Sequence, residues 1–196
     1  MKKPDILAAV EPIAKTFDRL GVLYYIGGSV ASSAYGIARA TLDVDIVSDL
    51  KLQNVKSLVE MLEMDYSIDE EMILDAIQRR SSFNLIHLET MLKVDIFIAE
   101  DSPYSREAFR RKRKETLDEE KETAEFYLAS CEDIILSKLE WFRKGGGVSE
   151  RQWNDVLGVI KIQGDLLEME YLVRWAAELG ISELLEKAFS DAGIRK

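Results

Sequence analysis

The segment from residue 22 to residue 47 constrains the fold most strongly, because it joins two strand-like runs through a glycine turn. The run Val22-Leu23-Tyr24-Tyr25-Ile26 is apolar, rich in β formers and bounded by glycine, which predicts a buried strand. Gly27-Gly28-Ser29 is the turn that leaves this strand. We predict that Ser29 caps a short helix that reaches Tyr35 and ends at Gly36.

Three aspartates lie on predicted strands. Asp43 and Asp45 alternate with apolar residues, so period-two geometry places both carboxylates on one face of a strand. Asp95 lies in the run 91–98, which we predict to pair antiparallel with residues 82–88 through a tight turn. Lys93 shares the face of Asp95, so this strand alone is equally compatible with a surface Lys–Asp pair and with a metal ligand. The upstream aspartate pair favours the metal.

A glycine turn at a helix start, followed by strand carboxylates, is suited to binding a metal ion and a triphosphate. Backbone N–H groups at a helix N-terminus bind phosphate oxygens, and glycine allows the phosphates to approach closely. Carboxylates at i and i+2 on a strand lie roughly 6–7 Å apart at their Cα atoms, which lets both reach one Mg²⁺. A third carboxylate on a neighbouring strand would complete a second metal site.

In this order of motifs, residues 22–98 resemble the nucleotidyltransferase superfamily typified by DNA polymerase beta. Six residues match its phosphate turn and its metal ligands: Gly27, Gly28, Ser29, Asp43, Asp45 and Asp95. The resemblance implies that the first two acids bind Mg²⁺ or Mn²⁺, and that the third binds a second metal and helps to activate the attacking hydroxyl. It implies an enzyme that moves a nucleoside monophosphate from a nucleoside triphosphate (NTP) to a hydroxyl. The gap between the turn and the acids is at the long end of the family's range.

Further motifs resemble the abortive-infection type of bacterial nucleotidyltransferase, which is often the toxin of a toxin–antitoxin pair. Arg39-Ala40-Thr41 precedes the acidic pair, and Asp133-x4-Lys138 and Arg151-x3-Asp155 follow on predicted helices. The resemblance implies that Arg39, Thr41 and Lys138 contact the nucleotide, and that Asp155 positions the triphosphate or Lys138. Without this pattern, Lys138 and Asp155 would read as ordinary charges on amphipathic helices.

The periodicity of the chain changes near Ser130. Residues 1–129 mix strands and helices, with a helix expected over 103–113 and a strand over 122–128, and form the expected nucleotidyltransferase core. Residues 130–196 show only helical periodicity. Ser130 and Ser149 are predicted to cap the first two helices of this second part. The expected architecture is α/β (α+β): a small mixed sheet flanked by helices, followed by a C-terminal helical bundle.

Composition narrows the classes of partner. The net charge of −10 argues against general coating of nucleic acids, which depends on Lys and Arg. The basic cluster, residues 110–114, fits either a solvated helix end neutralised by nearby acids or a groove for RNA or a phosphate tail. A single histidine, His87, and a single cysteine, Cys131, argue against zinc chemistry and against an internal disulfide, so we expect a cytoplasmic protein. We expect no membrane association, because no apolar run approaches the roughly 20 residues that span a bilayer.

The acceptor is open at this point. A protein hydroxyl, a tRNA end and a small molecule such as an aminoglycoside are all compatible with the motifs, and the protein partner is either an antitoxin or a second copy of the chain. The alternative function is a catalytically silent nucleotidyltransferase-fold protein that acts as a regulatory or partner-binding module. Binding of NTPs in the presence of Mg²⁺ discriminates between the two functions.

Overall fold

A computed structural model describes residues 5–116 and 125–194. The chain divides into two compact units. Unit 1 comprises Met1–Gly27 and Thr41–Leu128, and unit 2 comprises Gly28–Ala40 and Ala129–Lys196. Residues 28–40 therefore group with the C-terminal helices rather than with the strands that precede and follow them in the sequence.

Unit 1 is built on one mixed sheet. In the part of the chain that the structure describes, its strands lie in the order β3-β4-β5-β2-β1-β7-β6. β2 pairs parallel with β5 and β1 pairs parallel with β7, whereas the other neighbours are antiparallel. The strands are β1 (Tyr24–Ile26), β2 (Asp43–Ser48), β3 (Tyr66–Ser67), β4 (Ser82–His87), β5 (Lys93–Ile98), β6 (Arg113–Thr116) and β7 (Glu125–Leu128).

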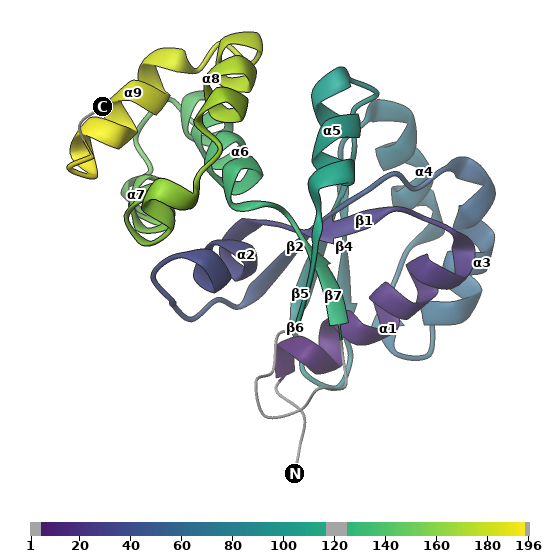
Figure 1. Ribbon diagram of the computed structural model, residues 1–196. Coiled ribbons are helices and arrows are strands. Elements are labelled where there is room, and N and C mark those ends of the chain that lie inside the picture. Colours follow the sequence, from purple (N-terminus) through teal and green to yellow (C-terminus); the bar gives the residue numbers. More distant parts are fainter. Residues whose placement is uncertain (1–4, 117–124, 195–196) are drawn as a thin grey trace. The chain divides into compact units, whose positions relative to one another are not determined.

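Helices cover one face of this sheet. Figure 1 shows three of them together on that face: α1 (Asp5–Leu20), α3 (Val55–Leu62) and α4 (Glu70–Arg79). Unit 1 also contains the 3₁₀ turn η1 (Leu52–Asn54) and helix α5 (Pro103–Arg111). The strand side chains on the covered face are fully buried, among them Val44, Ile46, Val94 and Ile96. Alternation then directs the side chains between them to the opposite face of the sheet.

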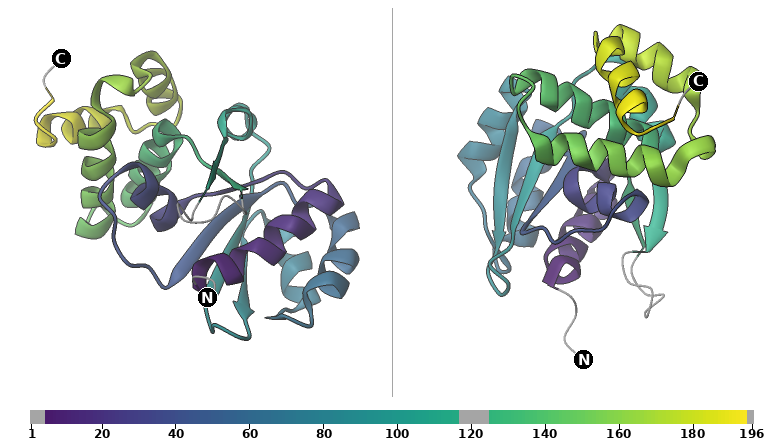
Figure 2. Two further views of the ribbon diagram at one scale, coloured as in Figure 1. Left: turned by 60° about the horizontal axis from the view of Figure 1, so that its bottom comes forward. Right: turned by 90° about the vertical axis from the view of Figure 1, so that its left-hand side faces the viewer.

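Unit 2 is helical in its described residues. It contains α2 (Gly28–Tyr35), α6 (Cys131–Lys144), α7 (Glu150–Gln163), the turn η2 (Gly164–Leu166), α8 (Met169–Glu178) and α9 (Ser182–Asp191). α2 packs against α6 and α7, as Figure 2 also shows, while α8 and α9 pack against α6 and against each other. The contact at the end of α2 is very close, because a Cβ added to Gly36 would lie 2.9 Å from the backbone oxygen of Ser32 and from the backbone nitrogen of Val159.

Most of the predicted elements are confirmed. The antiparallel pair β4–β5 is present, and α2 ends at Tyr35, next to Gly36. Ser130 and Ser149 accept hydrogen bonds from the backbone N–H groups of Asp133 and Gln152, as expected for N-caps. No described helix has the combination of length and hydropathy that a bilayer crossing requires.

Two local predictions are wrong, and two short strands were missed. Ser29 does not cap α2, because the helix already begins at Gly28. The helix expected over 103–113 ends at Arg111, and Arg113 opens strand β6, which the sequence did not indicate. The short strand β3 was also missed, since two residues carry no periodicity. The first residues of the strand expected over 122–128 lie outside the described residues.

Candidate active-site residues

β2 and β5 bring three carboxylates to one face of unit 1. The two parallel strands are in a register that opposes Asp45 to Asp95 and Asp43 to Lys93. Neighbouring strands lie about 4.8 Å apart, so the side chains of Asp45 and Asp95 start from adjacent positions and point the same way. All three aspartates are half-buried. The three aspartates therefore lie on adjacent strands and on one face of the sheet.

Lys93 adds a positive charge to these carboxylates. Its Nζ lies 2.7 Å from Oδ2 of Asp95, so the Lys–Asp pair that the sequence allowed is present. The hydrogen bond with Asp95 raises the pKa of Lys93, and the charges of Asp95, Asp43 and Asp45 raise it further against the opposing effect of burial. The ammonium group therefore interacts with all three carboxylates rather than with Asp95 alone.

The donor chemistry of this face suits a hard divalent cation. Three carboxylates and no nitrogen or sulfur ligands form the set that Mg²⁺ and Mn²⁺ prefer. The positive charge of the Lys93 ammonium lies next to these carboxylates. In the described residues, no group of three or more His, Cys, Asp or Glu side chains is arranged to hold a metal ion.

Two other predicted residues of unit 1 support the acidic strand. Thr41 donates from Oγ1 to Oδ1 of Asp43 at 2.6 Å. The backbone N–H of Gly27 donates to the backbone oxygen of Asp45 at 2.9 Å. Thr41 therefore restrains an aspartate side chain, and Gly27 fixes the end of β1 beside β2.

Asp155 is the centre of a hydrogen-bonded network in unit 2. Its carboxylate accepts from Nε and Nη2 of Arg39, both at 2.9 Å, and from Nζ of Lys138 at 2.8 Å. Nη2 of Arg39 also donates to Oγ of Ser29. The side chains of Asp155 and Lys138 are only 7% and 9% exposed. Four predicted nucleotide-binding residues are thus in direct contact within one unit.

The network keeps the Asp155 carboxylate ionised. Burial by itself would raise the pKa of Asp155, but hydrogen bonds from Arg39 and Lys138 outweigh burial and lower it below the ordinary value. Two cations therefore share one carboxylate, which leaves the network with a net positive charge. A group with that charge is suited to phosphate oxygens.

The glycine turn lies where the chain passes from one unit to the other. Gly28 has φ of 54°, a left-handed conformation that favours glycine, and it is the first residue of α2. The predicted residues divide between the units accordingly. Unit 1 holds Gly27, Thr41, Asp43, Asp45 and Asp95, and unit 2 holds Gly28, Ser29, Arg39, Lys138 and Asp155.

Sequence reasoning missed the contact between Arg39 and Asp155. The two residues are 116 positions apart, and no local pattern reports a pairing at that separation. The family resemblance linked Asp155 only to the triphosphate or to Lys138. The bidentate geometry, with two nitrogens of one guanidinium on one carboxylate, is a strong and directional contact that fixes the orientation of Arg39.

Three residues of the basic cluster have side-chain partners within unit 1. Lys112 lies with Nζ 3.7 Å from the centre of the Tyr127 ring, and Lys114 pairs with Glu125. Nη1 of Arg110 lies 3.4 Å from Oε2 of Glu107. These contacts favour a structural role over a nucleic-acid groove. The acidic residues 118–120, which were expected to balance the cluster, lie outside the described residues.

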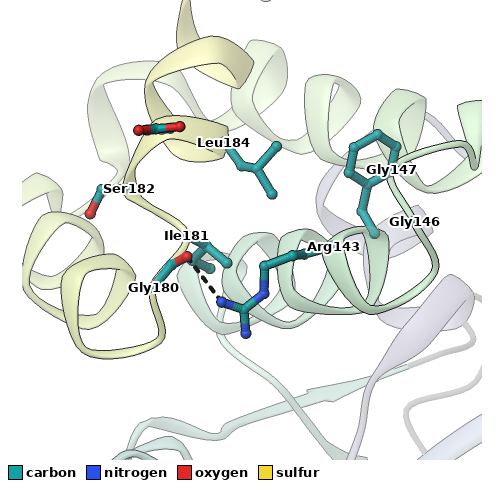
Figure 3. A pocket seen from close by; sticks show the side chains of 9 residues that line it. Arg143, Gly146, Gly147, Gly180, Ile181, Ser182 and Leu184 are labelled. Atoms are coloured by element: carbon teal, nitrogen blue, oxygen red, sulfur yellow. Dashed lines mark hydrogen bonds between the residues drawn. The ribbon is translucent and has the colours of Figure 1, made fainter.

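Each unit also has a surface pocket that contains none of the predicted site residues. The unit 2 pocket, of about 710 Å³, lies between the glycine-rich turn after α6 and the start of α9. Figure 3 shows Arg143 at its edge, where Nη1 donates to the backbone oxygen of Gly180 at 3.0 Å. The unit 1 pocket, of about 390 Å³, lies near Leu23, Asp49 and Ala99, beyond the carboxyl ends of β2 and β5 and away from the predicted acids.

The sheet, with its acid-x-acid strand beside a strand that carries a third acid, defines the nucleotidyltransferase fold, as the sequence predicted. Comparison with solved structures agrees. The chain is similar to the lincosamide antibiotic adenylyltransferase LnuA in its lincomycin-bound structure, with 16% identity, a TM-score of 0.51, and coverage of 83% of this chain and 98% of LnuA. It is also similar to the antibiotic-resistance factor ANT(2'')-Ia, with 15% identity, a TM-score of 0.54, and coverage of 88% and 94%.

A third similar structure is an antigenic nucleotidyltransferase-like protein from Paracoccidioides brasiliensis. It shares 15% identity at a TM-score of 0.53, and the match covers 93% of each chain. No protein-family model and no curated protein sequence matches the chain. At these identities the similarity establishes the fold, and the narrower resemblance to the abortive-infection type stays a prediction.

Proposed function

We propose that the protein is a metal-dependent nucleotidyltransferase that moves a nucleoside monophosphate from an NTP to a hydroxyl acceptor, with release of pyrophosphate. The observation that carries this proposal is the register of β2 and β5, in which Asp95 is opposed to Asp45 on the face that also carries Asp43. The nucleotidyltransferase fold gives independent support. A solvated strand face would need neither three aligned acids nor a cation held among them.

Asp43 and Asp45 are the proposed ligands of Mg²⁺ or Mn²⁺, and Asp95 is the proposed ligand of a second ion. Such ions, when bound, supply positive charge to phosphate oxygens and make a hydroxyl more acidic. Asp95 would also accept the proton of the attacking hydroxyl, which requires that its carboxylate first separate from Lys93. Thr41 would act indirectly, by holding the Asp43 carboxylate in one orientation.

The phosphates of the NTP are the proposed ligands of the turn and of the Asp155 network. Gly28 and Ser29 offer backbone N–H groups at the start of α2, and Gly27 would contribute through the same turn. Arg39 and Lys138 would supply positive charge to the triphosphate. Asp155 is proposed as a positioning residue, because it holds both cations in fixed orientations before any ligand arrives.

A small molecule is the acceptor class that we propose to test first. The support comes from the similar structures, since LnuA is a lincosamide antibiotic adenylyltransferase and ANT(2'')-Ia is an antibiotic-resistance factor. A protein hydroxyl and a tRNA end are the other classes, and a toxin with an antitoxin partner is the version implied by the Arg39-x-Thr41 motif. A cytoplasmic location is part of the proposal, supported by the single cysteine of the sequence, Cys131, which rules out a disulfide within the chain.

A labelled-NTP assay with the Asp45→Asn variant tests the proposal. Each α-labelled NTP is incubated with Mg²⁺ and three acceptor pools: antibiotics and metabolites, total tRNA, and cell lysate protein. We expect label transfer by the wild type and by Asp101→Asn, a matched control whose exposed carboxylate pairs with Arg106 in unit 1. Asp45→Asn should reduce transfer to background while its melting temperature stays near that of the wild type.

The catalytically silent alternative predicts a different result. A silent protein would show no transfer in any acceptor pool, and no NTP would raise its melting temperature in the presence of Mg²⁺. Turnover retained by Asp45→Asn would instead show that the acidic face has no catalytic role. The two outcomes can be told apart, because transfer retained by Asp45→Asn still shows an active enzyme, whereas a silent protein shows no transfer at all.

A further inference from the structure

Four charged side chains occupy adjacent positions on the open face of unit 1. Asp43 and Asp45 on β2 are opposed to Lys93 and Asp95 on β5, and all four point to the same side. One ammonium therefore lies among three carboxylates, in contact with Asp95 at 2.7 Å. The arrangement is not a peripheral surface pair, because both strands are internal to the sheet.

We propose that Lys93 is the internal counter-ion of this acidic face, and that a divalent cation must displace its ammonium from Asp95 in order to bind. The proposal rests on the proposed function, since it concerns the same carboxylates. It assigns Lys93 the role of a positioning residue that controls metal affinity. Lys93 does not act as a metal ligand or as a catalytic group.

Electrostatics give the reason for such a residue. Three carboxylates on neighbouring strand positions repel one another, and without a cation this repulsion would destabilise the sheet or protonate one acid. The ammonium of Lys93 relieves the repulsion, and all three acids in turn raise its pKa. A lysine ammonium is charged at neutral pH, so Lys93 leaves Asp95 by rotation of its side chain.

The side chain is able to make that movement. It is 47% exposed, whereas the side chain of Asp95 is 20% exposed, so the ammonium lies on the solvent side of the pair. Lysine carries its charge on a flexible four-carbon stem, and a well-hydrated ammonium tolerates release into water. The strand backbone can stay in place while the charge moves.

Metal binding by the EDTA-treated full-length protein tests the proposal without any activity assay. Free Mn²⁺ is measured by electron paramagnetic resonance during titration of the wild type, Lys93→Met and Lys93→Arg. The matched control is Lys114→Met, which removes another strand lysine paired with a strand carboxylate of the same unit, Glu125. Melting temperatures in EDTA and in saturating Mn²⁺ are recorded for each protein.

We expect Lys93→Met to bind Mn²⁺ roughly three- to tenfold more tightly than the wild type, since it removes the competing charge. Its melting temperature should fall in EDTA and return towards the wild-type value in Mn²⁺. Lys93→Arg and Lys114→Met should keep the wild-type affinity or bind more weakly. The gain should persist at about 0.5 M KCl, where exposed charges are screened beyond a few ångströms.

An unchanged or weaker affinity in Lys93→Met, with Mn²⁺ binding by the wild type, would overturn the role of Lys93 and leave the proposed function standing. A gain of the same size in Lys114→Met would also overturn it, because the effect would then reflect net charge alone. If neither the wild type nor Lys93→Met binds Mn²⁺, both the inference and the metal-dependent function are wrong. Binding by Lys93→Met alone would support the inference in its strongest form.

Discussion

The substitution Asp155→Asn should destabilise unit 2, because it removes the carboxylate that two cations share. In the wild type this carboxylate accepts two hydrogen bonds from Arg39 and one from Lys138, at distances from 2.8 to 2.9 Å. Asparagine keeps one acceptor oxygen and replaces the other with an NH₂ group that faces the cations. The variant therefore leaves two positive charges without their counter-ion in a largely buried position.

Burial sets the size of the effect. Removing one partner of a buried ion pair costs about 3–5 kcal/mol, whereas an exposed pair contributes about 0–1 kcal/mol. Lys138 is 9% exposed and Arg39 is 26% exposed, so water screens part of the guanidinium charge. We expect a loss of about 2–4 kcal/mol in the free energy of unfolding of unit 2, between those two limits.

Tryptophan fluorescence reports this loss selectively. The three tryptophans of the chain are Trp141, Trp153 and Trp175, and all belong to unit 2. With a urea dependence of about 2 kcal/mol per molar, the expected loss lowers the urea midpoint by about 1–2 M. The control is Asp191→Asn, which removes an exposed carboxylate that also pairs with a lysine, Lys187. Its midpoint should stay close to that of the wild type.

Two further measurements decide whether charge is the cause. Adding Lys138→Met to Asp155→Asn removes one of the two stranded cations, so the double variant should be more stable than the single variant. The pKa of Asp155 is lower in the folded protein than in the unfolded chain, where it is near 3.9. The stabilising effect of this carboxylate is therefore complete above about pH 3.9, and it is lost as the pH falls through the lower pKa of the folded protein. The midpoint difference between the wild type and Asp155→Asn should therefore shrink below about pH 4. An Asp155→Asn midpoint equal to that of the wild type at pH 7, or a double variant less stable than the single one, would refute the reasoning.

Two more predictions follow from packing and burial. Gly36→Ala should lower the free energy of unfolding measured by tryptophan fluorescence by about 1–3 kcal/mol, because the new Cβ would lie 2.9 Å from backbone atoms. The control is Gly27→Ala, which should keep a melting temperature near the wild-type value, because nothing lies within 4 Å of its added Cβ. Burial raises the pKa of the Tyr24 phenol, so its contribution to stability is complete below about pH 10 and is lost as pH rises above that value. Circular-dichroism melts should therefore decline more steeply above about pH 10 for the wild type than for Tyr24→Phe, and equal slopes would contradict this cause.

Local periodicity was sufficient to predict most of the fold. The alternation of Asp43, Val44, Asp45 and Ile46 gave both the strand and the face of each side chain, since β geometry has a strict period of two. Two-residue β3 and the four residues of β6 were missed because such short elements carry no pattern of their own. β6 is stabilised by its neighbour β7, and a strand that depends on a partner leaves little local signal.

The contacts of the candidate residues were predictable only in part. Strand register could be anticipated for Asp95, because two parallel strands with acids at matching positions converge by geometry. The Arg39–Asp155 contact could not, since it joins α7 to the loop after α2 across 116 residues. Nor did the sequence indicate that Thr41 would restrain Asp43, because a hydroxyl two residues from a carboxylate is common and rarely structured.

Under the proposed function, the two interpretations that the sequence allowed for Asp95, a surface ion pair and a metal ligand, describe two states of one side chain. A carboxylate selected only for a surface pair with Lys93 would gain nothing from two further acids, which add repulsion to the same few positions. A carboxylate selected only for metal would not require a lysine two residues away that competes for it. Both features are explained if the acidic face must be stable before a cation binds, and if Asp95 must become available when the cation arrives. The ammonium of Lys93 is placed to meet both requirements, because it pairs with Asp95 and can move into solvent.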